Sequence, residues 1–335
     1  MMQAQAGLAV VTRPDSPPES NSRFTITSFF SGCGGMDLGF RGGFRFRDEY
    51  LEELPFDVVE SFDYDAKAVL TYRDNIDESI QIRDLGASGV LDMKASDVLI
   101  GGFPCQDFSS CGPKRGLASE RGQLYLALVA YMREHQPMVV VAENVPHLER
   151  IHAGDALRQI VADFEGEGYR FVKWRLYAPD YGVPQSRTRI FLVGVRKDLP
   201  GSPAIPTPTH SGAHRSIQWA IEDLESVLDE SVPNQSQFFL ASKAKRGNGQ
   251  GDELSRADRP AYTVRANAKS RVQFHYSLPR RLTVRECARL QTFPDDFAFP
   301  HSATANIMQI GNAVPPLLAH HVARSISEYL ETINT

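Results

Sequence analysis

The chain has 335 residues, of which 42% are hydrophobic and 10% aromatic, enough for one large domain and one smaller one. The net charge is −5, no run of about 18 apolar residues occurs, and the N-terminus lacks the basic and apolar stretches of a secretory signal. The four cysteines (Cys33, Cys105, Cys111, Cys287) are too scattered for a disulfide framework and show no zinc-type pairing. We therefore expect a reduced, cytoplasmic protein without a membrane partner or a bound metal.

The charge is unevenly distributed along the chain. Residues 243–289 contain 12 lysines and arginines against 4 aspartates and glutamates, whereas residues 1–195 contain 20 against 27. A basic segment of this kind can neutralise phosphates even in an acidic chain. An ordinary solvated charged face explains the same pattern equally well.

Residues 1–22 are rich in Pro, Ser, Ala and Gln and are predicted to form a flexible tail. From residue 23 onward, short apolar or β-branched runs alternate with helical stretches, which predicts an α/β fold with a doubly wound, mostly parallel sheet. The last two runs lie close together and should form an antiparallel pair. The predicted strands are Phe24–Phe30, Asp57–Phe62, Ser79–Ile82, Asp97–Gly101, Met138–Ala142, Arg170–Tyr177 and Arg189–Val195, and the predicted helices are Ala66–Asn75, Leu124–His135 and Asp155–Glu167.

The pattern changes after Lys197. The proline-rich stretch Pro200–His210 is typical of a linker, and residues 211–300 are irregular. Pro315 and Pro316 then open an amphipathic helix. The predicted organisation is a catalytic and cofactor-binding domain at 23–197, a smaller inserted domain at 198–300, and a C-terminal segment at 301–335 that packs back on the first domain.

Glycines follow the first predicted strand in the turn Phe30–Gly35, where the backbone could approach a nucleotide-like ligand. This signal is weak alone, because Asp37 stands where a dinucleotide fingerprint needs its third glycine. Asp63 follows the second strand, where a ribose would expect an acceptor, with Tyr64 beside it to pack on an adenine. Asp84 follows the third strand. Each could be an ordinary surface residue, but together they predict a cofactor crevice at the carboxyl edge of the sheet.

A second group of residues suits nucleophilic chemistry. Cys105 directly follows the fourth strand, and the polar loop Asp107–Gly122 after it is long enough to act as a lid. Glu143 ends the fifth predicted strand. Because side chains alternate along a strand, Arg187 and Arg189 should point to the same side of the last predicted strand. Addition of a thiolate to C6 of cytosine makes C5 nucleophilic, while a carboxyl group at N3 and an arginine at O2 hold the ring.

The ordered motifs resemble those of the cytosine-C5 DNA methyltransferase family, in particular bacterial type II modification enzymes, from Phe24 to about Ala319. The motifs are Phe30-Ser31-Gly32-Cys33-Gly34-Gly35, Pro104-Cys105-Gln106, Glu143-Asn144-Val145, Gln185-x-Arg187-x-Arg189, the segment Arg281–Pro294, and Gly311-Asn312-Ala313-Val314-Pro315.

The resemblance implies transfer of a methyl group from S-adenosylmethionine to C5 of a flipped-out cytosine in a specific double-stranded DNA sequence, leaving S-adenosylhomocysteine. It implies Cys105 as the nucleophile, Glu143 at N3 and Arg189 at O2, with Arg187 in support. Residues 198–262 would carry target recognition in a monomer that is one half of a restriction-modification system, with an endonuclease acting on the same site. The implied cofactor-binding residues are Phe30, Gly32, Cys33, Gly34, Gly35, Asp63, Tyr64, Asp84, Leu85, Pro104, Leu124, Asn312 and Val314.

Three alternatives remain. A branch of the same family methylates transfer RNA with the same motifs. A catalytically dead homologue that only binds DNA would usually have lost the cysteine, the glutamate or the arginines, all of which are present here. A nicotinamide-dependent oxidoreductase fits less well, because Gly39 lies too far along for the third fingerprint glycine.

Overall fold

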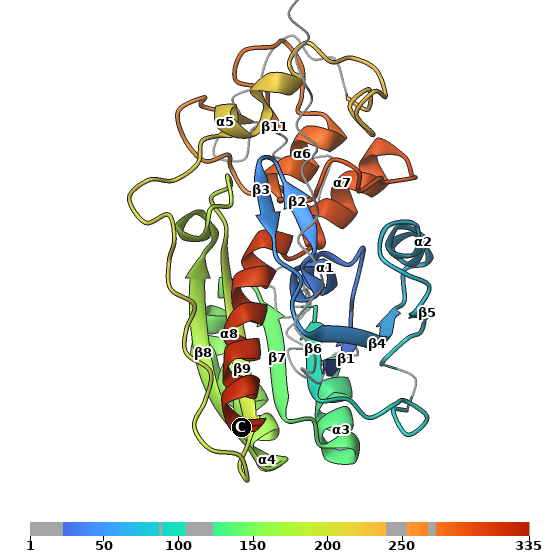
Figure 1. The fold of residues 1–335 in the computed structure, drawn as a ribbon, viewed down its shortest axis with the longest axis vertical. Helices are drawn as coiled ribbons and strands as arrows, with labels where there is room; N and C mark the ends of the chain where they lie inside the picture. The colour runs from blue at the N-terminus through green and yellow to red at the C-terminus, as the bar shows by residue number, and fades with distance from the viewer. Residues whose placement is uncertain (1–22, 87–88, 105–122, 239–252, 267–272, 335) are drawn as a thin grey trace, which may run out of the picture.

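The structure, a computed structural model, describes residues 23–86, 89–104, 123–238, 253–266 and 273–334 (Figure 1). Its centre is a seven-stranded sheet in the order β5-β4-β1-β6-β7-β9-β8. The strands from β5 to β7 are parallel, and β9 and β8 complete the sheet as the expected antiparallel pair. The strand bounds are β1 Phe24–Phe29, β4 Phe56–Asp63, β5 Ile80–Ile82, β6 Val98–Gly102, β7 Val139–Asn144, β8 Tyr169–Tyr177 and β9 Thr188–Arg196.

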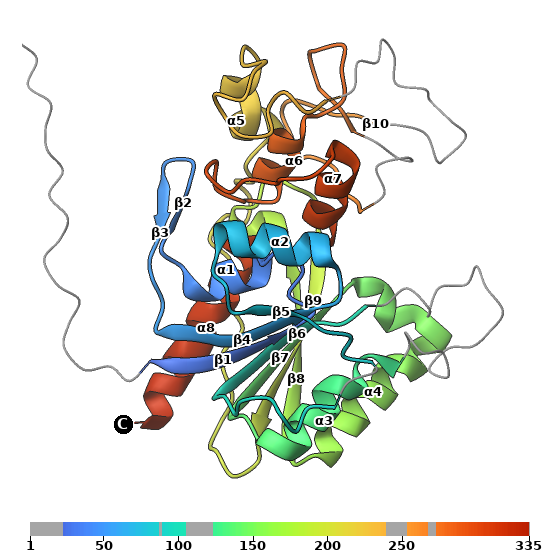
Figure 2. The ribbon, with the colours of Figure 1, turned by 90° about the vertical axis from the view of Figure 1, so that its right-hand side faces the viewer.

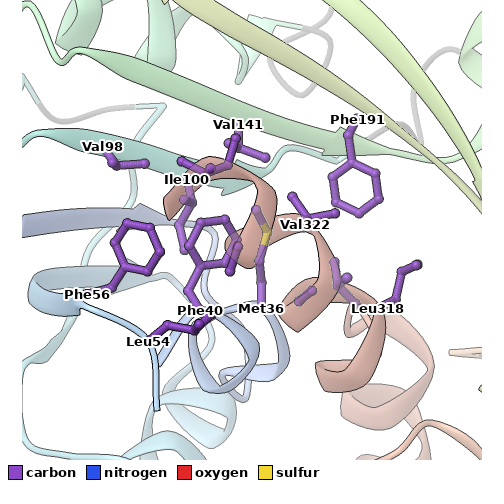
Figure 3. Close-up of a cluster of buried hydrophobic side chains, with 14 of the residues drawn as sticks. Met36, Phe40, Leu54, Phe56, Val98, Ile100, Val141, Phe191, Leu318 and Val322 are labelled. Atoms are coloured by element: carbon purple, nitrogen blue, oxygen red, sulfur yellow. The ribbon is translucent and has the colours of Figure 1, made fainter. Parts of the chain in front are cut away.

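Both faces of this sheet are buried, which explains why the strands β6 and β7 begin with continuous apolar runs rather than alternating. Along β7, Val139 and Val141 pack on one side while Val140 and Ala142 pack on the other. The helices α1 (Gly35–Arg41) and α8 (Pro316–Asn334) cover the first side, where Phe40 and Val322 join the cluster shown in Figure 3. The helices α3 (Leu126–His135) and α4 (Asp155–Gly166) cover the second side (Figure 2). The result is the predicted doubly wound, three-layered fold.

The remaining helices of this half connect the strands. The helix α2 (Ala66–Asn75) begins where the Asp65 side chain accepts a hydrogen bond from the Lys67 amide at 2.9 Å, and it leads into β5. Short 3-10 segments, η4 (Pro146–Gly154) and η5 (Ala178–Tyr181), follow β7 and β8. None of the described helices is both long and apolar enough to cross a membrane.

A second group of elements lies beyond one end of the sheet, at the top of Figure 1. It comprises α5 (Ile217–Ile221), η6 (Glu222–Leu224), β10 (Glu253–Leu254), β11 (Gln273–Phe274), α6 (Val284–Leu290) and α7 (Ala303–Asn312). The helix α7, which falls within the predicted C-terminal segment 301–335, packs in one apolar cluster with α6, whereas α8 packs against α1. A capping box between Thr283 and Glu286 starts α6.

Three arginines of the basic segment 243–289 are internal to this second group. Arg280 forms a bidentate pair with the buried carboxylate of Glu286, at 2.7 and 2.8 Å. Arg285 donates to three backbone carbonyls, and Arg289 pairs with Asp223 and Asp295. These guanidinium groups hold the fold together, so they are not the phosphate contacts that the charge count suggested.

A hairpin that the sequence analysis missed links the two groups. Strands β2 (Phe44–Phe46) and β3 (Glu49–Leu51) pair antiparallel and rise from the level of the sheet towards that of the second group (Figure 2). The ring of Phe46 packs edge-on against Trp219 of α5, and Arg47 pairs with Asp223. The hairpin therefore braces the second group from the side of the sheet.

Candidate active site

A cavity of about 1110 Å³ opens at the carboxyl ends of β1, β4, β6 and β7 and is closed on one side by the end of α7 and the residues after it, Ala313 and Val314. Parallel sheets bind ligands at this edge. Pockets for a single small ligand usually measure roughly 300–1,000 Å³, so this one has room for more than one group. Every predicted cofactor-binding residue except Gly34 lines it: Phe30, Gly32, Cys33, Gly35, Asp63, Tyr64, Asp84, Leu85, Pro104, Leu124, Asn312 and Val314.

The turn after β1 forms the floor of the cavity. Its backbone is left-handed at Phe30 (φ 56°), Gly32 (φ 57°) and Gly34 (φ 90°). A phenylalanine rarely adopts this conformation, and such strain is typical of functional sites. Gly34 itself faces α2, where a Cβ would collide with Ile76 and lie 2.8 Å from the Tyr72 ring. We infer that its requirement for glycine comes from helix packing.

Asp63 occupies the end of β4 with little exposed surface. Its Oδ2 accepts a hydrogen bond from the Gly32 amide and its Oδ1 one from the Asp65 amide, both at 2.8 Å. Burial raises the pKa of Asp63, while the two amide donors oppose the shift. These contacts hold the carboxylate against the glycine turn, and the exposed ring of Tyr64 lies next to it in the chain. The pair suits a ribose hydroxyl and an adenine face.

Glu143 and Arg189 meet on the wall formed by β7 and β9. Arg189 Nε lies 2.6 Å from Glu143 Oε1, with both side chains about nine-tenths buried, although the angle is not that of a hydrogen bond. Burial raises the pKa of Glu143, opposed by Arg189 and Arg187, and burial also lowers the pKa of Arg189. The backbone approaches closely here, because a Cβ on Gly102 would lie 3.2 Å from Glu143 Oε2.

Arg187 does not line the cavity but supports its walls. It is buried, and its guanidinium donates to the carbonyls of Val264, Gly311 and Ala313 at 3.1, 2.8 and 3.0 Å. Burial lowers its pKa well below the ordinary value. Next to it, Gln185 accepts from the Val264 amide and donates to the Leu290 carbonyl. Arg187 therefore joins the entry of β9 to the second group and to the cavity wall at residues 311–313.

Among the cavity-lining residues that the sequence analysis did not identify, two buried polar side chains stand out. Asp37, at the start of α1, is fully buried, and burial raises its pKa to about 6 although Ser28 and Tyr72 donate to it. Gln309 on α7 is 5% exposed, and neither atom of its side-chain amide has a partner among the described residues. Asp37 was noticed only as a missing glycine, and no pattern in the sequence marked Gln309.

Cys105 and the predicted lid 107–122 lie outside the described residues. Pro104, the residue before the cysteine, lines the cavity together with Glu143 and Arg189. In the part of the chain that the structure describes, no group of three His, Cys, Asp or Glu side chains could hold a metal ion.

Comparisons with known proteins identify the family. A family model of C-5 cytosine-specific DNA methylases matches residues 24–328. The chain belongs to this family. This member is therefore a DNA (cytosine-5-)-methyltransferase, as the motifs predicted. The curated relatives include the type II methyltransferase M.BspRI of Lysinibacillus sphaericus, 30% identical over 98% of this chain and 87% of the relative. Another is M.NgoFVII of Neisseria gonorrhoeae, 32% identical over 92% of this chain and 87% of the relative.

Solved structures agree on the fold of this family member. The S. pombe Dnmt2 methyltransferase superposes with a TM-score of 0.68 at 19% identity, covering 93% of this chain and all of that one. The Entamoeba histolytica methyltransferase EhMeth superposes with a TM-score of 0.66 at 14% identity, covering 92% and 99%. At these identities the likeness supports the fold class alone.

Proposed function

We propose that the cavity binds S-adenosylmethionine at its Asp63 side and a flipped-out cytosine at its Glu143 side, with Cys105 as the nucleophile. The observation that carries this proposal is the buried Glu143–Arg189 pair, which shares one cavity wall with Pro104, the neighbour of Cys105. A carboxyl group and a guanidinium there offer the contacts that N3 and O2 of cytosine require. A base can reach such a site only by leaving the stack, at a cost of a few kcal/mol.

The cofactor fits the residues present at the other side. Asp63 is held by two backbone amides and retains acceptor capacity for a ribose hydroxyl, while the turn Phe30–Gly35 allows close approach of a ligand. S-adenosylmethionine would supply an electrophilic methyl group there. The cavity volume of about 1110 Å³ accommodates this cofactor together with one base.

The chemistry assigned to the protein follows from these positions. The Cys105 thiolate adds to C6, forming a C–S bond, and the electron density that this pushes into the ring makes C5 a nucleophile. Because burial raises the pKa of Glu143, its carboxyl group can hold a proton and donate it to N3 as negative charge develops. Arg189 holds O2. After methylation a base removes the C5 proton, β-elimination breaks the C–S bond to free the thiolate, and N3 returns its proton to the Glu143 carboxylate.

We extend the proposal to the biological setting. The relatives named above are type II methyltransferases, which supports a role as the modification partner of a restriction endonuclease that reads the same DNA sequence. Residues 198–262 would read the bases, and the exposed arginines Arg256 and Arg259, which share the exposed Asp258 at 4.0 and 3.9 Å, would contact phosphates. We expect the enzyme to act as a monomer.

The test uses the protein on duplex DNA with 5-fluorocytosine at the target cytosine, mapped beforehand from methylated DNA of expressing cells. Fluorine cannot leave as a proton, so a covalent complex should accumulate when S-adenosylmethionine is present. Cys105→Ala should abolish trapping and turnover but retain DNA binding. The matched controls are Cys33→Ala and Cys287→Ala, which remove buried thiols and should still trap. An adduct in Cys105→Ala would refute the assignment, and methyl transfer to transfer RNA but not to duplex DNA would refute the substrate.

A further inference from the structure

The side chain of Gln309 is the least satisfied polar group on the cavity wall. It is 95% buried on α7, yet both Oε1 and Nε2 lack hydrogen-bond partners among the described residues. Asn306, almost one turn earlier on the same helix, instead donates to Gln237, Phe299 and His301 and accepts from the His301 amide. Burying a carboxamide without partners is unfavourable and is rare in folded proteins. The exception lies on a ligand cavity, which suggests that a ligand completes it.

The surroundings of Gln309 place it in the middle of the cavity. Its backbone carbonyl accepts from the Cys33 thiol at 3.8 Å, so it lies beside the turn that follows β1. In the sheet β1 lies between β4, which carries Asp63, and the strands β6 and β7, of which β7 carries Glu143. The helix of Gln309 continues into Asn312, which lines the same cavity. Gln309 therefore lies between the proposed ribose and base positions.

We propose that the Gln309 carboxamide binds the amino-acid end of S-adenosylmethionine, its Nε2 donating to the carboxylate and its Oε1 accepting from the ammonium group. This inference rests on the proposed cofactor. A carboxamide supplies a donor and an acceptor without net charge, which matches a zwitterion. Among the residues that the structure describes, the arginines that line the cavity are Arg83 and Arg189, and they are already paired with Asp92 and Glu143. The carboxylate therefore needs neutral donors, which Gln309 and nearby backbone amides offer.

The test compares two ligands that differ in the amino-acid end. Calorimetry would measure the binding of S-adenosylhomocysteine, which has that end, and of 5′-methylthioadenosine, which lacks it. Gln309→Met preserves the length of the side chain and removes its polar atoms. We expect it to bind S-adenosylhomocysteine about tenfold or more weakly, as for loss of a hydrogen bond to a charged group, and to bind methylthioadenosine like the wild type.

A second readout separates this role from a structural one. If the amide has no partner in the free protein, Gln309→Met should leave the ligand-free Tm unchanged or higher. The control Asn306→Ala removes satisfied hydrogen bonds, so it should lower that Tm. The ratio of its affinity for S-adenosylhomocysteine to its affinity for methylthioadenosine should stay at the wild-type value. Gln309→Glu places a carboxylate beside the carboxylate of S-adenosylhomocysteine. It should therefore reduce the ratio of the affinity for S-adenosylhomocysteine to that for methylthioadenosine.

The outcomes are distinguishable. A lower ligand-free Tm for Gln309→Met, or an unchanged affinity ratio in both Gln309 variants, would overturn the role of Gln309 and leave the cofactor assignment intact. Failure of the wild type to bind S-adenosylhomocysteine would overturn the proposed cofactor itself.

Discussion

Asp37 makes the stability of this enzyme depend on pH in a direction unusual for a carboxylate. Its side chain is fully buried in the first turn of α1, where Tyr72 donates to Oδ1 at 3.1 Å and Oδ2 has no partner in the described part of the chain. Burial raises its pKa from 3.8 to about 6. Because the folded state binds this proton more tightly than the unfolded state, the stabilisation is complete below pH 3.8 and is lost as the pH rises through about 6.

The magnitude follows from the shift. About two pKa units correspond to about 3 kcal/mol in total, and about half of this should be lost between pH 5 and pH 8. Asp37→Asn keeps an acceptor for the Tyr72 hydroxyl and removes the ionisation. We therefore expect the variant to gain about 1.5 kcal/mol of unfolding free energy relative to the wild type over this interval. Any fixed cost of the new amide cancels in the comparison of the two pH values.

Urea unfolding of both proteins at pH 5 and pH 8 measures the difference. Asp74→Asn is the matched control, because it makes the same exchange at an exposed aspartate of α2 and leaves the buried carboxylate of Asp37 in place. A difference between wild type and Asp37→Asn that does not change with pH would show that burial does not raise the pKa of Asp37. If the wild type instead gained unfolding free energy relative to Asp37→Asn between pH 5 and pH 8, the pKa of Asp37 would be lowered in the folded state rather than raised.

Three further substitutions test the site. Gly34→Ala should destabilise the fold by roughly 2–5 kcal/mol in urea unfolding, because φ is 90° and the new Cβ would collide with Ile76, yet leave the affinity for S-adenosylhomocysteine unchanged. Arg187→Lys should cost roughly 2–4 kcal/mol in the same assay, since an ammonium group cannot span the three carbonyls that the guanidinium reaches. Glu143→Gln should lower kcat by roughly 10²–10⁴-fold in a methyl-transfer assay with DNA binding retained, and near-normal turnover would exclude proton donation at N3.

The sheet could be predicted from the sequence because its strands are buried on both faces. Strands β6 and β7 contain continuous apolar runs, as in Val139–Ala142, and the helix α2 carries a clear N-cap at Asp65. The hairpin β2–β3 gave no such signal, since each strand has three residues and its turn places Arg47 rather than glycine at φ 53°. Its stability comes from contacts with Trp219 and Asp223, which are distant in sequence.

The site residues also fall into some that could be predicted from the sequence and some that could not. Glu143 and Arg189 could be assigned to one site in advance, because the family motifs imply that both contact the cytosine ring. That their strands β7 and β9 are neighbours became visible only in the structure. Asp37 and Gln309 could not, because their significance depends on burial and on missing hydrogen bonds. In the basic segment 243–289, by contrast, the sequence suggested phosphate-binding groups where the structure has internal ones. Charge counting treats every arginine as a surface group, whereas the Arg285 guanidinium donates hydrogen bonds to three internal backbone carbonyls.

Arg187 explains why the family motif contains two arginines when only one reaches the cavity. Arg189 needs a fixed position opposite Glu143, and its strand enters the sheet at Arg187. The Arg187 guanidinium ties that entry point to Val264 in the second group and to the carbonyls of Gly311 and Ala313, which flank the cavity-lining Asn312. One buried side chain thus holds the strand that carries Arg189, the cavity wall at residues 311–313 and the second group against one another. A displacement of the second group relative to the sheet would have to move or break these bonds, so the position of Arg189 opposite Glu143 depends on how the second group is seated.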